Sequence, residues 1–177
     1  RLTFSGGWTF SSTGALPNGV NAYANTYWNS VANAGTANAS MGVYMRTNTA
    51  DGAKIDIGFH RSSPTALSVI LTRFGNEYYG AINTNGSGTI ANTNTAGFFA
   101  VSTVALDNIT MHRNGVNTPK TITSTSSGNL NVFIGAKNLD GSPVLYSDRE
   151  HMIDFLGDGL TSAELIKLYN IFTTFKT

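Results

Sequence analysis

Hydrophobic residues alternate with polar ones at a period of two in several segments, and this pattern constrains the fold more than any other feature of the chain. It is clearest in KIDIGFH, residues 54–60, where Ile55, Ile57 and Phe59 face one way and the intervening residues face the other. Successive side chains of a strand point to opposite faces. The segment therefore predicts a strand with one buried face and one solvent-exposed face.

The same alternation predicts strands elsewhere. Met41, Val43 and Met45 alternate with Tyr44 and Arg46. Leu67, Val69 and Leu71 alternate with Ser68, Ile70 and Thr72, which predicts a strand buried on both faces. Weaker strand patterns cover residues 77–82, 97–103, 108–113, 131–137 and 151–156.

Turn-forming segments separate these strands. Asn114-Gly115 is a pair that tolerates positive φ at both central positions of a type I′ turn, so we expect a hairpin there. Residues 83–94 and 123–129 are rich in Gly, Asn, Ser and Thr and are expected to be loops. Many short antiparallel strands in 177 residues favour an all-β jelly-roll sandwich of two antiparallel sheets, formed as a single domain over residues 1–177.

The last segment has a different period. Thr161 and Glu164 form a capping box, and Leu165, Leu168 and Phe172 begin one apolar stripe that continues to residue 175. An isolated helix of about 15 residues is marginal in water. We therefore expect a closing helix over about residues 161–175 that docks on the sandwich as a latch.

LTSAELIKLY, residues 160–169, resembles the closing motif of laminin G-like, or concanavalin A-like, jelly-roll modules. MHRNGV, VFIGAKN and MIDF resemble the hairpin and later strands of the same modules, in the same order. The variant in this chain is similar to modules on phage tail or fibre proteins and on bacterial surface proteins. Because the chain starts at Arg1, we expect it to be a fragment of a longer protein. Such modules often hold calcium in loops; here Asp140 is a candidate ligand, but no other carboxylate is near it in sequence, so no metal or cofactor is predicted.

Composition disfavours several partners. Charged residues are 12% of the chain, the formal net charge is +1 and there is no run of Lys or Arg, so we expect no binding to nucleic acid. No apolar run approaches the roughly 18 residues that span a bilayer, so we expect no membrane insertion. The chain has no cysteine and therefore forms no disulfide.

Candidates for catalysis are few. Asp148 and Glu150, two apart in YSDREHMID, are predicted to share one face of a strand, and paired carboxylates about 5 to 9 Å apart cleave glycosidic bonds. Arg149 lies between them, and the E-x-D-x-x-E pattern of jelly-roll glycosidases is absent. His60, His112 and His151 have no metal-binding spacing, and there is no G-x-S-x-G motif. We predict no enzymatic activity.

Aromatic residues are better candidates for recognition. Trp8, Tyr27, Trp28, Tyr78 and Tyr79 lie among Asn, Ser and Gly residues, and sugar rings stack on aromatic faces while amides and hydroxyls bind their rims. The alternative is that these rings close the ends of the sandwich. Arg149 could donate and Asp148 could accept hydrogen bonds with a ligand, or the two could form a surface salt bridge. The predicted ligand-binding residues are Tyr27, Trp28, Tyr78, Asp148 and Arg149.

These observations favour a non-enzymatic recognition module that binds glycan or another surface polymer, carried extracellularly on a virion or cell surface. One alternative is a structural domain that contacts neighbouring subunits of a larger assembly. A third hypothesis is a glycoside hydrolase or polysaccharide lyase.

Overall fold

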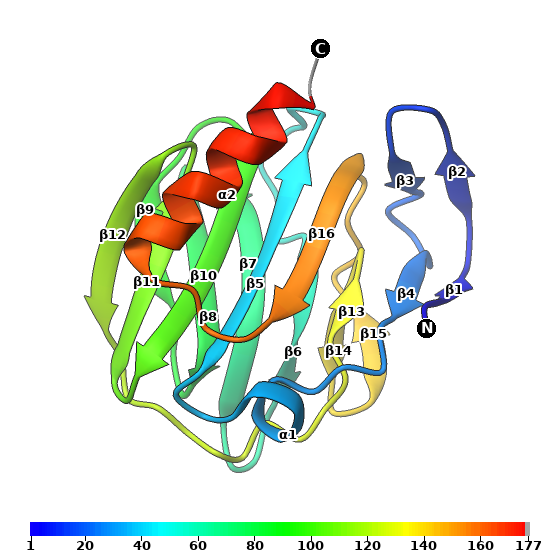
Figure 1. Cartoon of the computed structure of the whole chain (residues 1–177). Helices are drawn as coiled ribbons and strands as arrows, with labels where there is room; N and C mark the ends of the chain where they lie inside the picture. The colour runs from blue at the N-terminus through cyan, green and yellow to red at the C-terminus, as the bar shows by residue number, and fades with distance from the viewer. Residues whose placement is uncertain (176–177) are drawn as a thin grey trace.

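The structure, a computed structural model, describes residues 1–175 as two β-sheets packed face to face, with a helix on the outside of one of them (Figure 1). The 7-stranded sheet has the order β12-β11-β10-β5-β16-β3-β2. Its strands are β2 (Trp8–Phe10), β3 (Ala15–Pro17), β5 (Ala39–Met45), β10 (Gly97–Ala105), β11 (Asn108–Arg113), β12 (Val116–Thr121) and β16 (His151–Gly157).

The 9-stranded sheet has the order β1-β4-β13-β6-β7-β8-β9, with β14 and β15 attached beside β6. All pairings described are antiparallel except that of β14 with β6. The strands are β1 (Thr3–Ser5), β4 (Tyr23–Asn25), β6 (Ile57–Arg61), β7 (Ala66–Phe74), β8 (Glu77–Thr84), β9 (Gly88–Ala91), β13 (Phe133–Ile134), β14 (Lys137–Leu139) and β15 (Ser142–Val144).

The main core lies between the sheets and follows from the alternation in the sequence. Met41 and Val43 of β5 point inward from the 7-stranded sheet and meet Ile57 and Phe59 of β6 from the other. The short helix α1 (Ser30–Ala34) begins after Asn29, whose side chain accepts hydrogen bonds from the first backbone N–H groups of the helix.

The helix α2 (Ser162–Thr174) covers the outer face of the 7-stranded sheet (Figure 1). Thr161 and Glu164 form the predicted capping box. Beneath the helix, Phe98 contacts the rings of Phe155, Tyr169 and Phe172 with centroid separations of 6.0, 6.1 and 5.6 Å. The helix therefore closes a second apolar cluster, as expected of a latch.

The fold prediction is confirmed: the chain is an all-β sandwich of two antiparallel sheets with a C-terminal helix. The Asn114-Gly115 hairpin is also present, with φ of 46° and 89° between β11 and β12. Three local predictions are wrong. The strand predicted over residues 54–60 begins only at Ile57, and Ile55 packs in a different apolar cluster from Ile57 and Phe59. The expected loop over residues 83–94 contains β9, and the expected strand over residues 131–137 is split at Gly135, whose φ of 77° ends β13 before β14 begins. Strands β1 to β3, too short to show a period, were not predicted.

A buried histidine joins the β11–β12 hairpin to the latch. His112 Nε2 accepts from the Gly115 N–H at 2.9 Å, and its Nδ1 bonds Asn117 Oδ1 at 2.7 Å. The Asn117 amide then donates to the carbonyl of Ser162 in the first turn of α2 at 2.8 Å. Burial lowers the pKa of His112 below its ordinary value of 6.5, and the hydrogen bond to Asn117 opposes this only in part. The folded protein therefore favours the neutral ring.

Replacing Phe172 by Asp places a charge in the apolar seam under α2. We expect Phe172→Asp to lower the free energy of unfolding by about 3 kcal/mol or more. Ile171→Asp is the matched control, because Ile171 is 50% exposed and the new charge feels nearly the same helix dipole. The control should cost less than about 1 kcal/mol. Urea denaturation measures both, and equal losses would show that α2 does not dock.

Neutral His112 predicts a pH dependence of stability. A histidine whose folded pKa is lowered contributes stability that is present above its unfolded pKa and is lost as the pH falls through its folded pKa. Between about pH 8 and about pH 5, the wild type should therefore lose more stability than His112→Gln, whose amide does not titrate. Denaturation of both proteins at the two pH values gives the difference. A larger loss in the variant would contradict the assignment.

Candidate functional site

The predicted aromatic pair does not form one surface. Tyr27 has a positive φ of 57°, and its side chain is 53% exposed with its hydroxyl 3.1 Å from Thr3 Oγ1. Trp28 is half-buried and packs against the core between the sheets. It lines a pocket of about 210 Å³ together with Arg1, Leu2, Thr26, Ile134, Asp154, Phe155 and Leu156, and Tyr27 does not line it.

Tyr78 is corrected from a binding residue to a core residue. Its side chain is 0% exposed, its ring contacts Phe99 at 5.2 Å, and its hydroxyl donates to the carbonyl of Ala100 at 2.8 Å. Burial raises the pKa of its hydroxyl. A phenol at this position joins the two sheets and does not reach a surface ligand. Tyr78 thus follows the alternative prediction, in which the aromatic rings pack within the sandwich.

Arg149 is also corrected, because it lies wholly inside the protein. Its Nη1 donates to both carboxylate oxygens of Asp56 at 3.1 Å, and Arg149 and Asp56 are both 0% exposed. Further donors reach Thr49 Oγ1 and the carbonyls of Lys54 and Arg73. Asp56 was expected on the solvent face of its strand, and this pairing explains why it is buried instead. Arg149 therefore does not bind a ligand at the surface.

The two carboxylates beside Arg149 are held by different parts of the molecule. Asp148 and Glu150 lie in the segment before β16 and not on a strand, so the prediction that they share a strand face is wrong. Asp148 pairs with Lys54. Glu150 Oε1 accepts from the hydroxyls of Thr13 at 2.7 Å and Ser11 at 3.4 Å.

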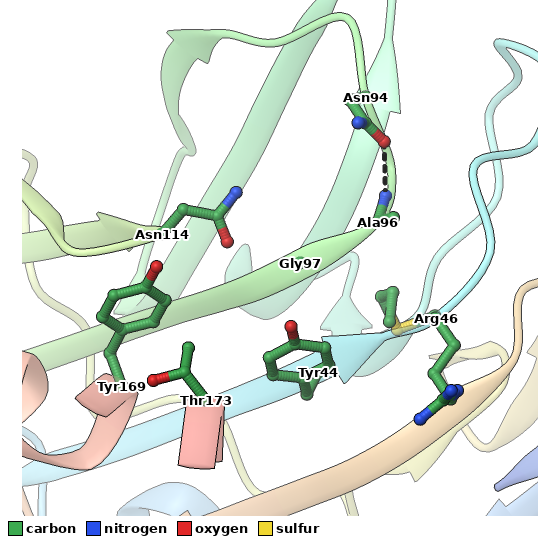
Figure 2. A pocket seen from close by; sticks show the side chains of 9 residues that line it. Tyr44, Arg46, Asn94, Ala96, Gly97, Asn114, Tyr169 and Thr173 are labelled. Atoms are coloured by element: carbon green, nitrogen blue, oxygen red, sulfur yellow. Dashed lines mark hydrogen bonds between the residues drawn. The ribbon is translucent and has the colours of Figure 1, made fainter. Parts of the chain in front are cut away.

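A different place on the molecule gathers polar and aromatic groups. A pocket of about 370 Å³ opens between the C-terminal half of α2, the end of β5, the start of β10 and the β11–β12 turn (Figure 2). We name it the latch pocket. It is lined by Tyr44, Met45, Arg46, Asn94, Ala96, Gly97, Asn114, Tyr169 and Thr173.

Local backbone geometry fixes one wall of the latch pocket. Gly97 has a φ of 125°, and a Cβ there would lie 2.3 Å from Asn114 Oδ1, so only glycine fits. Asn114 Oδ1 accepts from the N–H of Phe98 at 2.8 Å, while Asn94 Oδ1 accepts from that of Ala96 at 2.8 Å (Figure 2). Both carboxamides are thus anchored through oxygen at the rim.

The opposite wall is aromatic. Tyr44 lies on the face of β5 turned to α2, and Tyr169 comes from the helix (Figure 2). The ring of Tyr169 packs against His112 at 5.8 Å and against Phe98 at 6.1 Å. The docked latch therefore sets the position of this phenol.

A second pocket adjoins the first at Arg46. We name it the hairpin pocket; it measures about 510 Å³ and is lined by Ser11, Ser12, Thr13, Gly14, Arg46, Met152, Ile153 and Phe175. Arg46 lines both pockets, so they meet at its side chain. The backbone N–H of Arg46 donates to the carbonyl of Glu150 at 2.9 Å, which fixes where this side chain starts.

The lining of the latch pocket was not predicted. Alternation along β5 places Tyr44 and Val43 on opposite faces of the strand, and the apolar stripe of the helix includes Tyr169. Neither pattern tells which part of the helix packs on which strand. The alternation puts Arg46 on the same side of the strand as Tyr44 but does not mark it as part of a pocket, and Asn94 carries no periodic signal.

Among residues 1–175, no group of three or more His, Cys, Asp or Glu residues is placed to hold a metal ion. Asp140 instead accepts from the N–H of Ser62 at 2.9 Å. Within the same residues, no helix has the length and apolar character needed to cross a bilayer.

No protein-family model matches the chain. No curated protein matches it in sequence either. Solved structures do match in fold. A mutant of Trypanosoma rangeli sialidase displaying trans-sialidase activity has a TM-score of 0.64 and 14% identity over 95% of this chain, which spans 29% of that chain.

The binding domains of botulinum neurotoxin serotypes D and G match with TM-scores of 0.57 and 0.56 and identities of 9% and 15%. The matches cover 96% and 98% of this chain, and it spans 46% of each of those two chains. The chain thus spans less than half the length of these similar structures. At such identities the likeness establishes the fold alone, a concanavalin A-like sandwich.

Removing Arg149 leaves the carboxylate of Asp56 buried without a counter-charge. We expect Arg149→Met to lower the free energy of unfolding by about 3–5 kcal/mol, and Arg149→Met combined with Asp56→Asn to recover part of that loss. Arg46→Met is the control, since Arg46 is exposed and should change stability by about 0.5 kcal/mol or less. Chemical denaturation compares the variants. A loss in Arg149→Met no larger than in the control would contradict the burial of the pair.

Proposed function

We propose that this chain is a non-enzymatic recognition module that binds a glycan in the latch pocket. The observation that carries the proposal is the lining of that pocket, where residues with two phenols, two carboxamides, a threonine hydroxyl and a guanidinium surround an open space of about 370 Å³. Sugars present apolar ring faces and many hydroxyls, which such groups bind by stacking and by hydrogen bonding.

The donors at the rim suit a polyhydroxylated ligand. The carboxamide oxygens of Asn94 and Asn114 are engaged with backbone N–H groups, so their NH₂ groups are oriented as donors at the pocket edge (Figure 2). A hydroxyl can accept from these amides and donate to a phenol oxygen at the same time. Anchored groups of this kind lose little entropy when they bind.

Similarity to known proteins supports recognition as the role. The neurotoxin structures that share this fold are binding domains by description. The closing helix motif resembles that of modules on phage tail or fibre proteins and bacterial surface proteins. We therefore extend the proposal to an extracellular module that is carried on a virion or cell surface and attaches it to a glycan-bearing host or matrix.

A second candidate function is that of a structural domain contacting neighbouring subunits. The observation in its favour is an apolar surface on β1 to β3, where Phe10 is 61% exposed and packs with Phe4 and Trp8 at centroid distances of 5.1 and 6.2 Å. Exposed apolar patches often mark protein contacts. Native mass spectrometry tests this alternative, which predicts a stable oligomer that Phe10→Ser dissociates.

Catalysis is not part of the proposal. Asp148 and Glu150 are each engaged with a separate partner, Lys54 and the Thr13 hydroxyl, and neither lines the latch pocket. Paired action of an acid and a base on one glycosidic bond needs both groups at the same bond.

Tyr169→Phe tests the site, because it removes the hydroxyl but keeps the ring on Phe98 and His112. We expect it to weaken the best-bound saccharide of a glycan array about 2- to 10-fold, the effect of losing one neutral hydrogen bond. Titration calorimetry measures the change. The same mixtures, assayed for new reducing ends, should show no release from the wild type.

Two controls locate the binding. Tyr79→Phe removes a phenol from β8 of the other sheet and should leave affinity unchanged. Tyr27→Ala removes the exposed ring of the first predicted site. If Tyr27→Ala abolishes binding while Tyr169→Phe has no effect, the glycan binds at Tyr27 and not in the latch pocket. Reducing ends released by the wild type but not by Glu150→Gln would establish a hydrolase instead.

A further inference from the structure

We infer that the glycan bound by this module is anionic, and that Arg46 binds its carboxylate or sulfate group where the latch pocket and the hairpin pocket meet. This inference rests on the proposed function and specifies the class of saccharide. It follows from the charge, the contacts and the position of one side chain.

Arg46 has no counter-charge within the described chain. None of the ion pairs formed among residues 1–175 includes it. Its side chain is exposed, and its Nη1 donates to the sulfur of Met152 at 3.7 Å. A thioether is a weak acceptor. The guanidinium fork, which matches the two oxygens of a carboxylate or sulfate, is therefore available to a ligand.

The surroundings of Arg46 favour a negative ligand. Neither pocket is lined by an Asp or Glu of the described residues, and Arg46 is the one charged residue in both linings. The backbone carbonyl of Glu150 accepts from the N–H of Arg46, but the Glu150 carboxylate accepts hydrogen bonds from the hydroxyls of Thr13 and Ser11 and forms no ion pair with Arg46. In a chain with only 12% charged residues, a cation at the junction of two pockets is a distinctive feature.

The position of Arg46 also suggests how a chain of sugars would lie. Arg46 has a pocket of about 370 Å³ on one side and one of about 510 Å³ on the other. An anionic sugar bound at Arg46 can therefore have a neighbouring sugar in either pocket. Tyr169, Asn94 and Asn114 offer an aromatic ring and amides on one side (Figure 2). Serine and threonine hydroxyls line the other. The arrangement fits an internal unit of an acidic oligosaccharide better than a single terminal sugar.

The test uses a glycan array with neutral, carboxylated and sulfated saccharides, followed by titration of the best-bound saccharide and its chemically neutralised form, carboxyl-reduced or desulfated. We expect anionic saccharides to bind best, and neutralisation to weaken binding at least about tenfold, the effect of losing a charged hydrogen-bond pair. Arg46→Gln should lose the same factor, and Arg46→Lys should recover only part because it lacks the planar fork. Added salt should weaken binding of the anionic form and not of the neutral form.

Lys167→Gln is the matched control, since it removes one exposed positive charge of α2 that lines neither pocket. It should leave affinity unchanged. This inference would be overturned if neutral saccharides bind best and Arg46→Gln binds them with unchanged affinity. The proposed function would still stand if Tyr169→Phe loses affinity for the same saccharides. An array with no bound saccharide would overturn both. If carboxyl reduction of the saccharide weakens binding, Arg46 binds a carboxylate. If desulfation weakens it, Arg46 binds a sulfate.

Discussion

The buried ion pair between Arg149 and Asp56 is the interaction on which the arrangement of the two sheets depends. Asp56 precedes β6 of one sheet, and Arg149 precedes β16 of the other. Two buried charges are stable only when every oxygen and N–H finds a partner. Here Asp56 also accepts from the Ser147 hydroxyl at 2.7 Å and the Thr72 N–H at 2.9 Å. The pair, with hydrogen bonds to both carboxylate oxygens and from all three guanidinium nitrogens, thus links the sheets at the point where β16 begins.

The same link reaches the candidate site. Glu150 follows Arg149 directly, and its backbone bonds to the two residues after β5: its N–H donates to the hydroxyl of Thr47 at 2.9 Å, and its carbonyl accepts from the N–H of Arg46 at 2.9 Å. The position of Arg46 between the two pockets is therefore set by the ion pair through one intervening residue. Arg149 was predicted to bind a ligand. It instead helps to position Arg46, the residue that we propose binds the ligand.

The sequence allowed the layers to be predicted but not the site. Period-two alternation located β5, β7, β8, β10, β11 and β16 because each strand buries one face or both, and the capping box located α2 because it depends on adjacent residues. Asp56 was misplaced because alternation assigns a charge to solvent, and its partner lies 93 residues away. The latch pocket combines single residues of several segments, and no local pattern reports that they meet.

Docking of α2 and the proposed binding in the latch pocket are two parts of one equilibrium. Tyr169 reaches the pocket only while its ring lies on Phe98, and the helix start is tied through Asn117 to His112 beneath that ring. A ligand that binds the docked helix and not the open form stabilises the docked form by mass action. Conversely, anything that loosens the seam, such as protonation of His112, removes a wall of the pocket. The closing helix of this sandwich thus contributes to stability and forms part of the surface proposed to bind the ligand.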